Sequence, residues 1–332
     1  MAILRLLRVV YDEAPALESF DDCTIFQTIQ WLNFVACTQK AEPVIAVVKD
    51  GEHTVGRFTG LIVRRYGLRI LGSPFPGWTT PYMGFNLKPS ISRTDALLAL
   101  ESFAFRDLKC AHLEIMDRRL SLDEVQRLGY RYKAYNGLEI DLTKGYDELF
   151  SAMDPACRRC IRKANKVGVQ VEEAKDVSFV DDYYAQLQDV FAKQNLVPTY
   201  SKERVRSLVD NLLPTGRLLL VRARDSEGAC IATGIFPAMN DTMYFWGGAS
   251  YRSYQILRPN EVVQWFAMRY WKARGIIKYD FGGGGEYKRK YGGYDIAVPW
   301  IRISKYPVLE YLRNGARELF AFKQRILGFR KR

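Results

Sequence analysis

The chain has 332 residues, 48% of them hydrophobic and 13% aromatic, which predicts a folded protein with a sizeable core and excludes a disordered chain. No apolar run reaches the roughly 18 residues that a membrane span needs, and Arg5 and Arg8 interrupt the apolar start, so we expect no signal peptide and a cytoplasmic protein. The formal net charge of +12 favours an anionic partner (nucleic acid, nucleotide phosphate or an acidic membrane surface), with a solvated basic face as the alternative.

The cysteines and histidines limit which disulfides, metal sites and catalytic nucleophiles are expected. The six cysteines are spread through the chain, which favours reduced and mostly buried thiols over a disulfide framework. Cys157 and Cys160 have the CxxC spacing, but no second CxxC follows, and His53 and His112 are the only histidines. We therefore predict no metal site. The scarcity of histidine also argues against a Ser-His or Cys-His nucleophile.

The predicted elements alternate between short apolar strands and amphipathic helices. Strand candidates lie at 44–48, 58–64, 111–116, 137–142, 217–222, 229–236, 242–247, 277–281 and 296–303. Apolar residues recur at helical spacing in 181–193 and in 201–212, where Ser201 is the expected N-cap. Pro259 is placed to open a helix over 260–274, because its missing N–H costs nothing in a first turn. The sequence therefore predicts an α+β fold.

From residue 146 to 303 the expected order is two helices, three strands, a helix and a strand. This order matches the GNAT superfamily of acyltransferases, in which a meander is followed by one crossover helix and a further strand. The first 145 residues fit a looser version of the same order. We predict an N-terminal domain over 1–145, completed by about 305–332, and a C-terminal catalytic domain over 146–304.

The segment 72–84 is the main irregular loop, and Pro74, Pro76 and Pro81 restrict it. Long loops are often functional, so Trp78 within it is a candidate substrate contact. A rigid surface turn with no role in binding is the alternative.

The richest set of motifs lies between residues 242 and 293. It runs through an aromatic strand and small-residue turn (244–250), Pro259-Asn260, Gln264-Trp265, a Gly-to-YDFGG stretch (275–283) and an aromatic-Lys-x-x-aromatic-Gly-Gly close (287–293). A basic helix with Arg158, Arg162, Lys163 and Lys166, followed by Gly168-Val169, precedes it. As a set, these motifs resemble the FemABX peptidyltransferases, a branch of the GNAT superfamily.

The resemblance implies two GNAT-like domains, with a C-terminal helix packing back on the first. It also implies an aminoacyl-tRNA donor and no resident cofactor. The residue carried over most directly is Lys288, which matches the lysine of the closing motif and is placed in that family to stabilise charge at the reacting carbonyl. A fixed cation at a developing oxyanion is typically worth about 100- to 1000-fold in rate. A solvated surface lysine is the alternative interpretation.

Other candidates carry less specific signals. Asp280 either orients the attacking amine or caps the glycine loop. Tyr287 and Tyr291 are candidate substrate-binding aromatics or packing residues. The basic residues of the 158–166 helix either contact the phosphates of the donor or form a solvated face; they are Arg158, Arg162, Lys163 and Lys166.

The residues at the start of the predicted crossover helix indicate which acyl donor the protein uses. Acetyl-CoA-dependent GNAT enzymes usually present Arg/Gln-x-x-Gly-x-Gly/Ala there, so that backbone N–H groups bind the pyrophosphate. This chain has Arg252-Ser-Tyr-Gln-Ile-Leu257, with bulky residues at both small positions. The sequence therefore favours charged tRNA over acetyl-CoA or another acyl-CoA, which stays as the alternative donor.

The acceptor is less well defined. Phe26-Gln27 and Trp31 resemble the early segment of the family, but the lysine and arginine that contact nucleotide phosphate there have no clear match. An amine of a cell-envelope precursor is expected, either a peptidoglycan peptide or an amino sugar of a surface glycan. The basic C-terminus (313–332, net +6) suggests contact with the inner face of the membrane, with a solvated tail as the alternative. A non-enzymatic RNA-binding protein is the rival outside catalysis.

Overall fold

The computed structural model describes residues 4–11, 20–192 and 196–306, which divide into two compact units. The first unit takes in residues 35–134 with the described parts of 1–22 and of the segment from 298. The second unit takes in residues 23–34 and 135–297. Within the described ranges, no helix is both long and apolar enough to cross a membrane.

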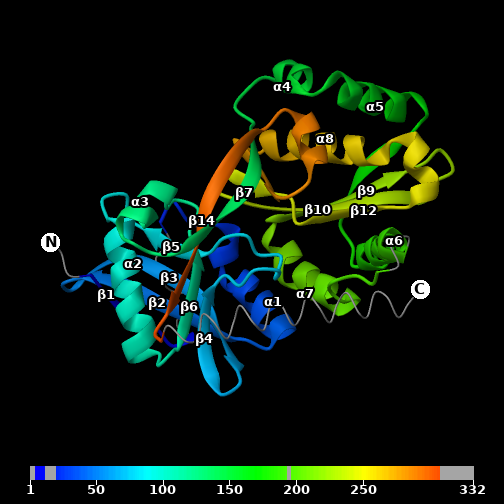
Figure 1. The fold of residues 1–332 in the computed structure, drawn as a ribbon. Coiled ribbons are helices and arrows are strands. Elements are labelled where there is room, and N and C mark those ends of the chain that lie inside the picture. The colour runs from blue at the N-terminus through cyan, green and yellow to red at the C-terminus, as the bar shows by residue number, and fades with distance from the viewer. Residues whose placement is uncertain (1–3, 12–19, 193–195, 307–332) are drawn as a thin grey trace. The chain divides into compact units, whose positions relative to one another are not determined.

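The first unit is a mixed sheet with one long helix against it (Figure 1). In spatial order its strands are β1 (Leu4–Arg8), β2 (Glu42–Asp50), β3 (His53–Arg65), β4 (Leu68–Ser73), β6 (His112–Met116) and the end of β14 (Tyr294–Ser304), and β5 (Gly84–Leu87) pairs with β3. Helix α2 (Arg93–Ser102) begins where the Ser92 side chain accepts the N–H of Asp95, and continues as a π-helical turn, Phe103–Asp107. A short α3 (Leu122–Arg127) follows β6.

The core of the first unit is built from the alternation of its strands. Leu4 and Leu6 of β1 are buried whereas Leu7 is exposed, as the two-residue period of a strand dictates. They pack with the apolar face of α2, whose Ala96, Leu97 and Leu100 recur at helical spacing and are buried.

The second unit is also a mixed sheet, but more helices pack against it. Its strands in spatial order are β7 (Tyr132–Asp141), β13 (Lys278–Gly283), β11 (Thr242–Tyr244), β10 (Cys230–Met239), β9 (Leu218–Arg224) and β8 (Gln170–Ala174), and β12 (Gly247–Ser250) pairs with β10. Its helices are α1 (Ile29–Gln39, in part), α4 (Tyr146–Ala152), α5 (Pro155–Lys166), α6 (Phe179–Ala192), α7 (Lys202–Leu212) and α8 (Pro259–Lys272). Figure 1 shows α8 and α5 over one face of the sheet and α6 below the other.

The two units share one topology. In each, the fourth strand runs parallel to the strand that follows a crossover helix: β4 pairs with β6 across α2, and β11 pairs with β13 across α8. In each, a short continuation strand pairs back on the third strand, β5 on β3 and β12 on β10. The predicted α+β class and the internal duplication are confirmed.

Several local predictions are refined. The predicted strand 242–247 is two strands, interrupted at Phe245 and Trp246, because β12 leaves the line of β11. Strand β8 was not predicted, since its QVEEA sequence lacks the apolar run of a central strand and it lies at the edge of the sheet. The predicted C-terminal helix lies outside the described residues. The boundary predicted near residue 145 stays a prediction, since a division by packing need not follow the repeat.

Candidate functional site

The candidate site begins where two parallel strands of the second unit part. β11 and β13 are in register from Thr242 opposite Lys278 to Tyr244 opposite Asp280. The last backbone bond between these two strands runs from the N–H of Phe245 to the carbonyl of Asp280, at 3.1 Å. Beyond it β12 pairs with β10, so the outer part of β13 loses this neighbour. Carbonyls near the end of a strand that has lost its neighbour need other donors.

Lys288 supplies those donors. It lies in the 3-10 turn Glu286–Tyr291, only 8% exposed, and its Nζ donates to the carbonyls of Phe281 at 2.7 Å and Gly283 at 2.8 Å. An ammonium group has three N–H donors, and these two bonds use two of them. The Nζ atom also lies 5.8 Å and 5.5 Å from the centroids of the Phe245 and Phe281 rings. Burial lowers the pKa of Lys288 to about 8, against the opposing charge of Asp280.

The glycines around Lys288 form an open cleft of about 220 Å³. Lys288 and Glu286 line it together with Asn136, Gly137, Gly282, Gly284, Gly285, Leu138, Arg289 and Asp295. Gly282, Gly284 and Gly285 have φ of 70°, 74° and 85°, a region that side-chain-bearing residues rarely adopt. The chain therefore turns sharply and presents backbone, with little side-chain bulk, beside the ammonium group of Lys288.

Asp280 lies at the fork itself, 2% exposed. Its Oδ1 accepts the N–H of Gly282 at 2.7 Å, so it caps the glycine turn. Asp280 therefore caps the glycine loop, which is one of its two predicted roles. Its other predicted role, orienting an amine, stays a prediction.

The two tyrosines of the closing motif occupy different places. Tyr291 is 2% exposed and its ring stacks on Phe281 at 5.3 Å, so it belongs to the core below the cleft. Burial raises its pKa well above the usual value. Tyr287 is 56% exposed and its ring lies next to Gly285. Of the two, Tyr287 is the one that can meet a ligand from solution.

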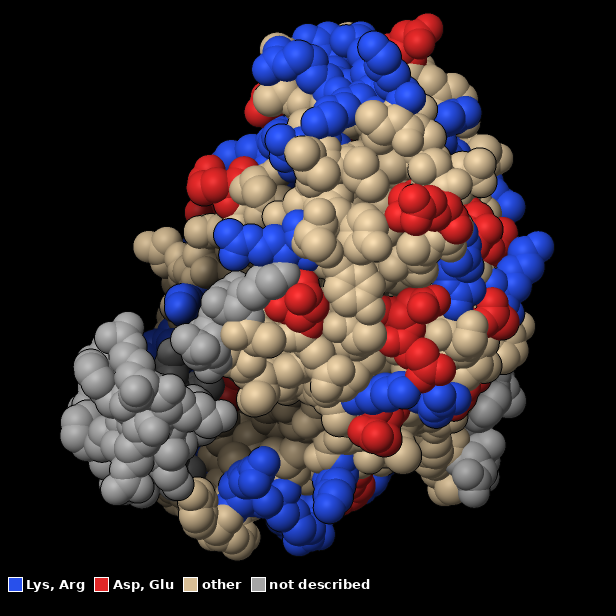
Figure 2. Space-filling model, turned by 90° about the vertical axis from the view of Figure 1, so that its right-hand side faces the viewer, with Lys and Arg blue, Asp and Glu red and all other residues tan. Residues whose placement is uncertain are grey.

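The predicted basic helix is α5. It packs against α8 through Cys157, Ile161 and Ala164, which are buried. Arg159, Arg162, Lys163 and Lys166 are exposed, Arg158 is half-buried, and residues 155–166 contain no acid. Among the described residues, no ion pair to these five side chains is found, and Figure 2 shows basic groups gathered at the top of the face, over α5. By contrast, Lys290 near the cleft pairs with Glu261 at 2.7 Å.

The start of α8 has few N–H groups to offer a ligand. Residues 252–257 form a 3-10 turn, Arg258 is left-handed (φ 61°), and Pro259 has no N–H to offer. The N–H of Arg252 is already bound by the Asp189 carboxylate of α6 at 3.1 Å.

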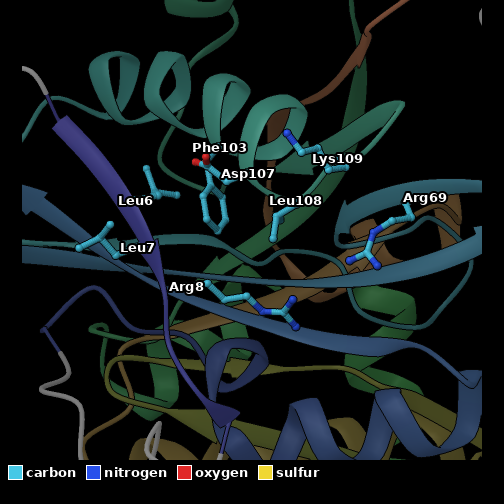
Figure 3. Close-up of a pocket in the computed structure, with 8 residues that line it drawn as sticks. All are labelled: Leu6, Leu7, Arg8, Arg69, Phe103, Asp107, Leu108 and Lys109. Atoms are coloured by element: carbon cyan, nitrogen blue, oxygen red, sulfur yellow. The ribbon is translucent and has the colours of Figure 1, made fainter.

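Trp78 lies in the first unit, where its ring packs against Phe75 at 4.8 Å. A separate hollow of about 490 Å³ lies in that unit, between β1 and the segment 103–107 (Figure 3). Arg8 and Arg69 on its border both bind the Glu42 carboxylate, so two of its cations are engaged. No predicted catalytic residue lines it.

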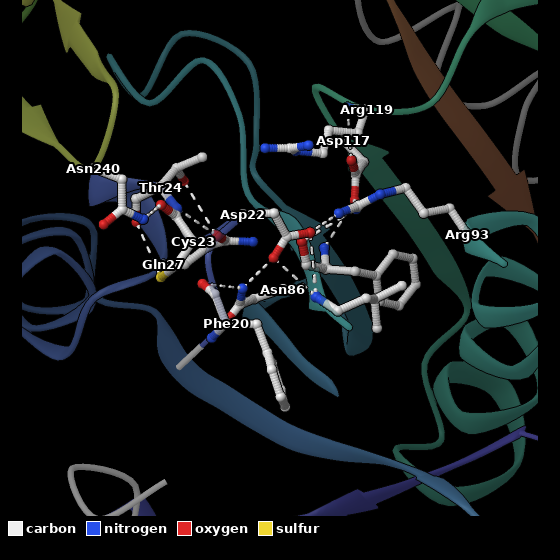
Figure 4. A network of polar contacts seen from close by, with 12 residues as sticks. Phe20, Asp22, Cys23, Thr24, Gln27, Asn86, Arg93, Asp117, Arg119 and Asn240 are labelled. Carbon is white, nitrogen blue, oxygen red and sulfur yellow. Dashed lines mark hydrogen bonds and ion pairs between the residues drawn. The ribbon is translucent and has the colours of Figure 1, made fainter. Parts of the chain in front are cut away.

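The fork of the first unit, between β5 and β6, is filled with ion pairs. The N–H of Met83 meets the carbonyl of Met116 at 3.1 Å, and Asp117 then accepts the N–H of Phe85 at 2.9 Å. Arg93, at the start of α2, binds both Asp117 and Asp22, as Figure 4 shows. Burial raises the pKa of Asp117, against the opposing charge of Arg93.

Sequence reasoning missed three residues of the second unit. Tyr135 binds the glycine turn through its hydroxyl, Asp189 accepts the N–H of Arg252 before α8, and Arg204 is a buried guanidinium over the Phe34 ring. Burial lowers the pKa of Arg204 to about 10. None of the three belongs to a motif, and each is brought to its place by tertiary packing.

Comparisons with known proteins agree with the topology. Residues 154–291 match the protein-family model described as "Acetyltransferase (GNAT) domain". No curated protein sequence matches the chain significantly.

Solved structures match nearly the whole chain. A crystal structure of FemX has a TM-score of 0.71 at 15% identity, covering 90% of this chain and 97% of FemX. The C-terminal domain of a putative lysylphosphatidylglycerol synthetase from Agrobacterium fabrum has a TM-score of 0.53 at 10% identity, covering 90% of this chain and 92% of its own. A tandem GNAT protein from the clavulanic acid biosynthesis pathway has a TM-score of 0.51 at 12% identity, covering 92% and 99%. At these identities the likeness concerns the fold, and it confirms two GNAT-like domains.

Proposed function

The chain carries a GNAT-type acyltransferase domain, and we propose that it transfers an aminoacyl group from aminoacyl-tRNA to an amine of a cell-envelope precursor. The acceptor amine is that of a peptidoglycan peptide or of an amino sugar. The observation that carries the choice of donor is the Asp189 carboxylate on the N–H of Arg252, at the turn where a CoA pyrophosphate would need free N–H groups.

The basic face of α5 supports the same donor. A tRNA acceptor stem presents a row of phosphates, and unpaired Arg and Lys side chains are what binds such a row. Arg159, Lys163 and Lys166 are exposed on one helix without an acid among its residues. The FemX fold and that of a putative lysylphosphatidylglycerol synthetase, whose name gives an aminoacylated lipid as product, are consistent with this donor class.

The reaction follows from the cleft. The acceptor nitrogen attacks the carbonyl carbon of the aminoacyl ester, and the carbonyl oxygen becomes an oxyanion. Lys288 directs its remaining N–H to that oxyanion, in a site where two carbonyls already fix the ammonium group. The C=O bond then re-forms from the oxyanion, the bond to the ribose oxygen breaks, and the proton lost by the amine ends on that oxygen. No covalent enzyme intermediate is needed.

An acyl-CoA-dependent N-acyltransferase of an amino-sugar or exopolysaccharide pathway is the second candidate. The observation in its favour is the description of the matching family, which is that of acetyltransferases. The two candidates share Lys288 and differ in what binds at α5 and at the start of α8.

The test is a transfer assay with two donors. Purified protein is given tRNA charged with radiolabelled amino acids or labelled acetyl-CoA, with a muropeptide precursor or an amino-sugar nucleotide as acceptor. We expect label to leave tRNA for the acceptor amine, and expect loss of that transfer in Lys288→Met. Transfer from acetyl-CoA, with no response to charged tRNA, would overturn the donor assignment.

A further inference from the structure

The glycine turn at the cleft is held by hydrogen bonds and not by side chains of its own. Gly282, Gly284 and Gly285 all have left-handed φ values, and glycine loses more conformational freedom on folding than any other residue. Lys288 is positioned by the carbonyls of this turn and of Phe281. Any movement of the turn therefore moves the ammonium group.

One side chain from β7 holds the turn from the other side. The hydroxyl of Tyr135 accepts the N–H of Gly283 at 2.7 Å, while the carbonyl of Gly283 accepts Lys288 at 2.8 Å. The residue Gly283 is thus bound at both its N–H and its carbonyl, by Tyr135 and by Lys288. The absence of a side chain at Gly283 is required for this, because a Cβ there would lie 2.6 Å from the Tyr135 ring.

The chemistry of Tyr135 suits a fixed hydrogen-bonding role. Burial raises the pKa of Tyr135, and the nearby charge of Asp280 raises it further. The phenol therefore stays neutral at physiological pH, and its oxygen can accept from Gly283 without adding a charge to the cleft.

We propose that Tyr135 is a positioning residue, which fixes the Lys288 ammonium group in the cleft through the backbone of Gly283. Its effect on the reaction rests on the proposed function, whereas its effect on Lys288 does not. Removing the hydroxyl frees the N–H of Gly283, lets the turn move, and admits water to Lys288. A displacement of about 1 Å at a reacting group can cost on the order of 100-fold in rate.

The test uses Tyr135→Phe and measures the pKa of Lys288 directly. Labelling of the Lys288 amine by trinitrobenzenesulfonate is followed by mass spectrometry across pH, which reports its pKa without any substrate. In the unchanged protein we expect the labelling of Lys288 to have its midpoint at a pH of about 8. In Tyr135→Phe we expect the midpoint to rise toward about 10.4, the value of a hydrated lysine, because burial is the main cause of the lowering. In a transfer assay we expect kcat to fall ten- to a hundredfold with KM little changed.

The matched control is Tyr294→Phe, which also removes a phenol hydroxyl from the second unit, one bound to Glu139 and not to the glycine turn. It should leave the Lys288 midpoint unchanged. If circular dichroism shows that Tyr135→Phe does not fold, Gly283→Ala tests the same contact by pushing the ring away, and the same rise is expected.

Two results separate the hypotheses. An unchanged Lys288 midpoint in a folded Tyr135→Phe or Gly283→Ala variant overturns the positioning role. A raised midpoint in a protein that transfers nothing from charged tRNA supports the positioning role and overturns the proposed donor.

Discussion

The forks of the two units differ in how their polar groups are used. In both, a backbone N–H of the continuing strand meets a carbonyl of the crossover strand at 3.1 Å, from Met83 to Met116 and from Phe245 to Asp280. Beyond that point the first unit places Arg93 between two carboxylates. The second unit places glycines there, and a lysine whose ammonium group donates to two carbonyls and lies over the Phe245 and Phe281 rings.

The difference lies in whether the charges at each fork are paired with opposite charges. In the first unit each charge at the fork is bound by an opposite charge, so the site is filled. In the second unit, no carboxylate among the described residues is bonded to the ammonium of Lys288, which lines a cleft. Paired ions hold the first fork together, and the second fork contains the buried cation to which the proposed function assigns the oxyanion.

Breaking the fork of the first unit should affect stability and not activity. Arg93→Met leaves Asp117 and Asp22 buried, at 2% and 10% side-chain exposure, without their cation. Removal of one partner of a buried pair costs about 3–5 kcal/mol. Urea unfolding should show this loss, while transfer per folded molecule stays unchanged. Arg8→Met is the control, since its pair with Glu42 is about 40% exposed and worth at most about 1 kcal/mol. A loss no larger than that of the control would show that the network does not hold this fork.

Breaking the fork of the second unit should do the opposite. Lys288→Met removes the donor to the oxyanion, and we expect kcat to fall about 100- to 1000-fold. The control is Lys278→Met on the same strand, whose lysine pairs with Asp241 at the half-exposed start of β13. Equal rates for the two variants, each checked for folding, would remove Lys288 from the mechanism.

The pH dependence of transfer sharpens the same contrast. Burial lowers the pKa of Lys288 to about 8. Its ammonium form is therefore present below that pH and is lost as the pH rises above it. Once the rate is divided by the fraction of acceptor amine that is neutral at each pH, it should fall about tenfold between pH 7 and pH 9. Lys288→Met should lack this fall. If the rate, divided in the same way, rises through pH 8 instead, the neutral amine of Lys288 acts as a base.

The fold was predictable where local and tertiary signals agree. Apolar runs such as 218–224 and 230–239 are central strands buried on both faces, and Pro259 does open α8. Strand β8, with alternating exposed Glu and Gln, carries too weak a signal because it lies at a sheet edge. The break at Phe245 and Trp246 depends on the parting of β12 from β13, which no local pattern encodes.

The candidate site was predictable only in part. The motif around Lys288 identified a residue that the structure buries beside a cleft. Gln264 and Tyr279, also within the motifs, bind each other in the core at 2.5 Å, so part of the pattern reflects packing. Tyr135 is separated from Gly283 by 148 residues, and only the pairing of β7 with β13 brings them together.

The smallest expected effects are those of variants in α5. Here lysines without an ion pair are compared with an arginine that has one. Lys163→Gln and Lys166→Gln each remove one exposed cation that could contact a phosphate, so each should weaken binding of charged tRNA a few-fold and lower the slope of log K against log salt by about 1. Arg224→Gln is the control, since Arg224 is engaged by Glu172 at 2.8 Å and by the carbonyl of Gly228. Binding is measured by fluorescence anisotropy at two salt concentrations with charged and uncharged tRNA. If the α5 variants bind as tightly as Arg224→Gln with the same slope, the basic face is a solvated surface and the tRNA must be held elsewhere.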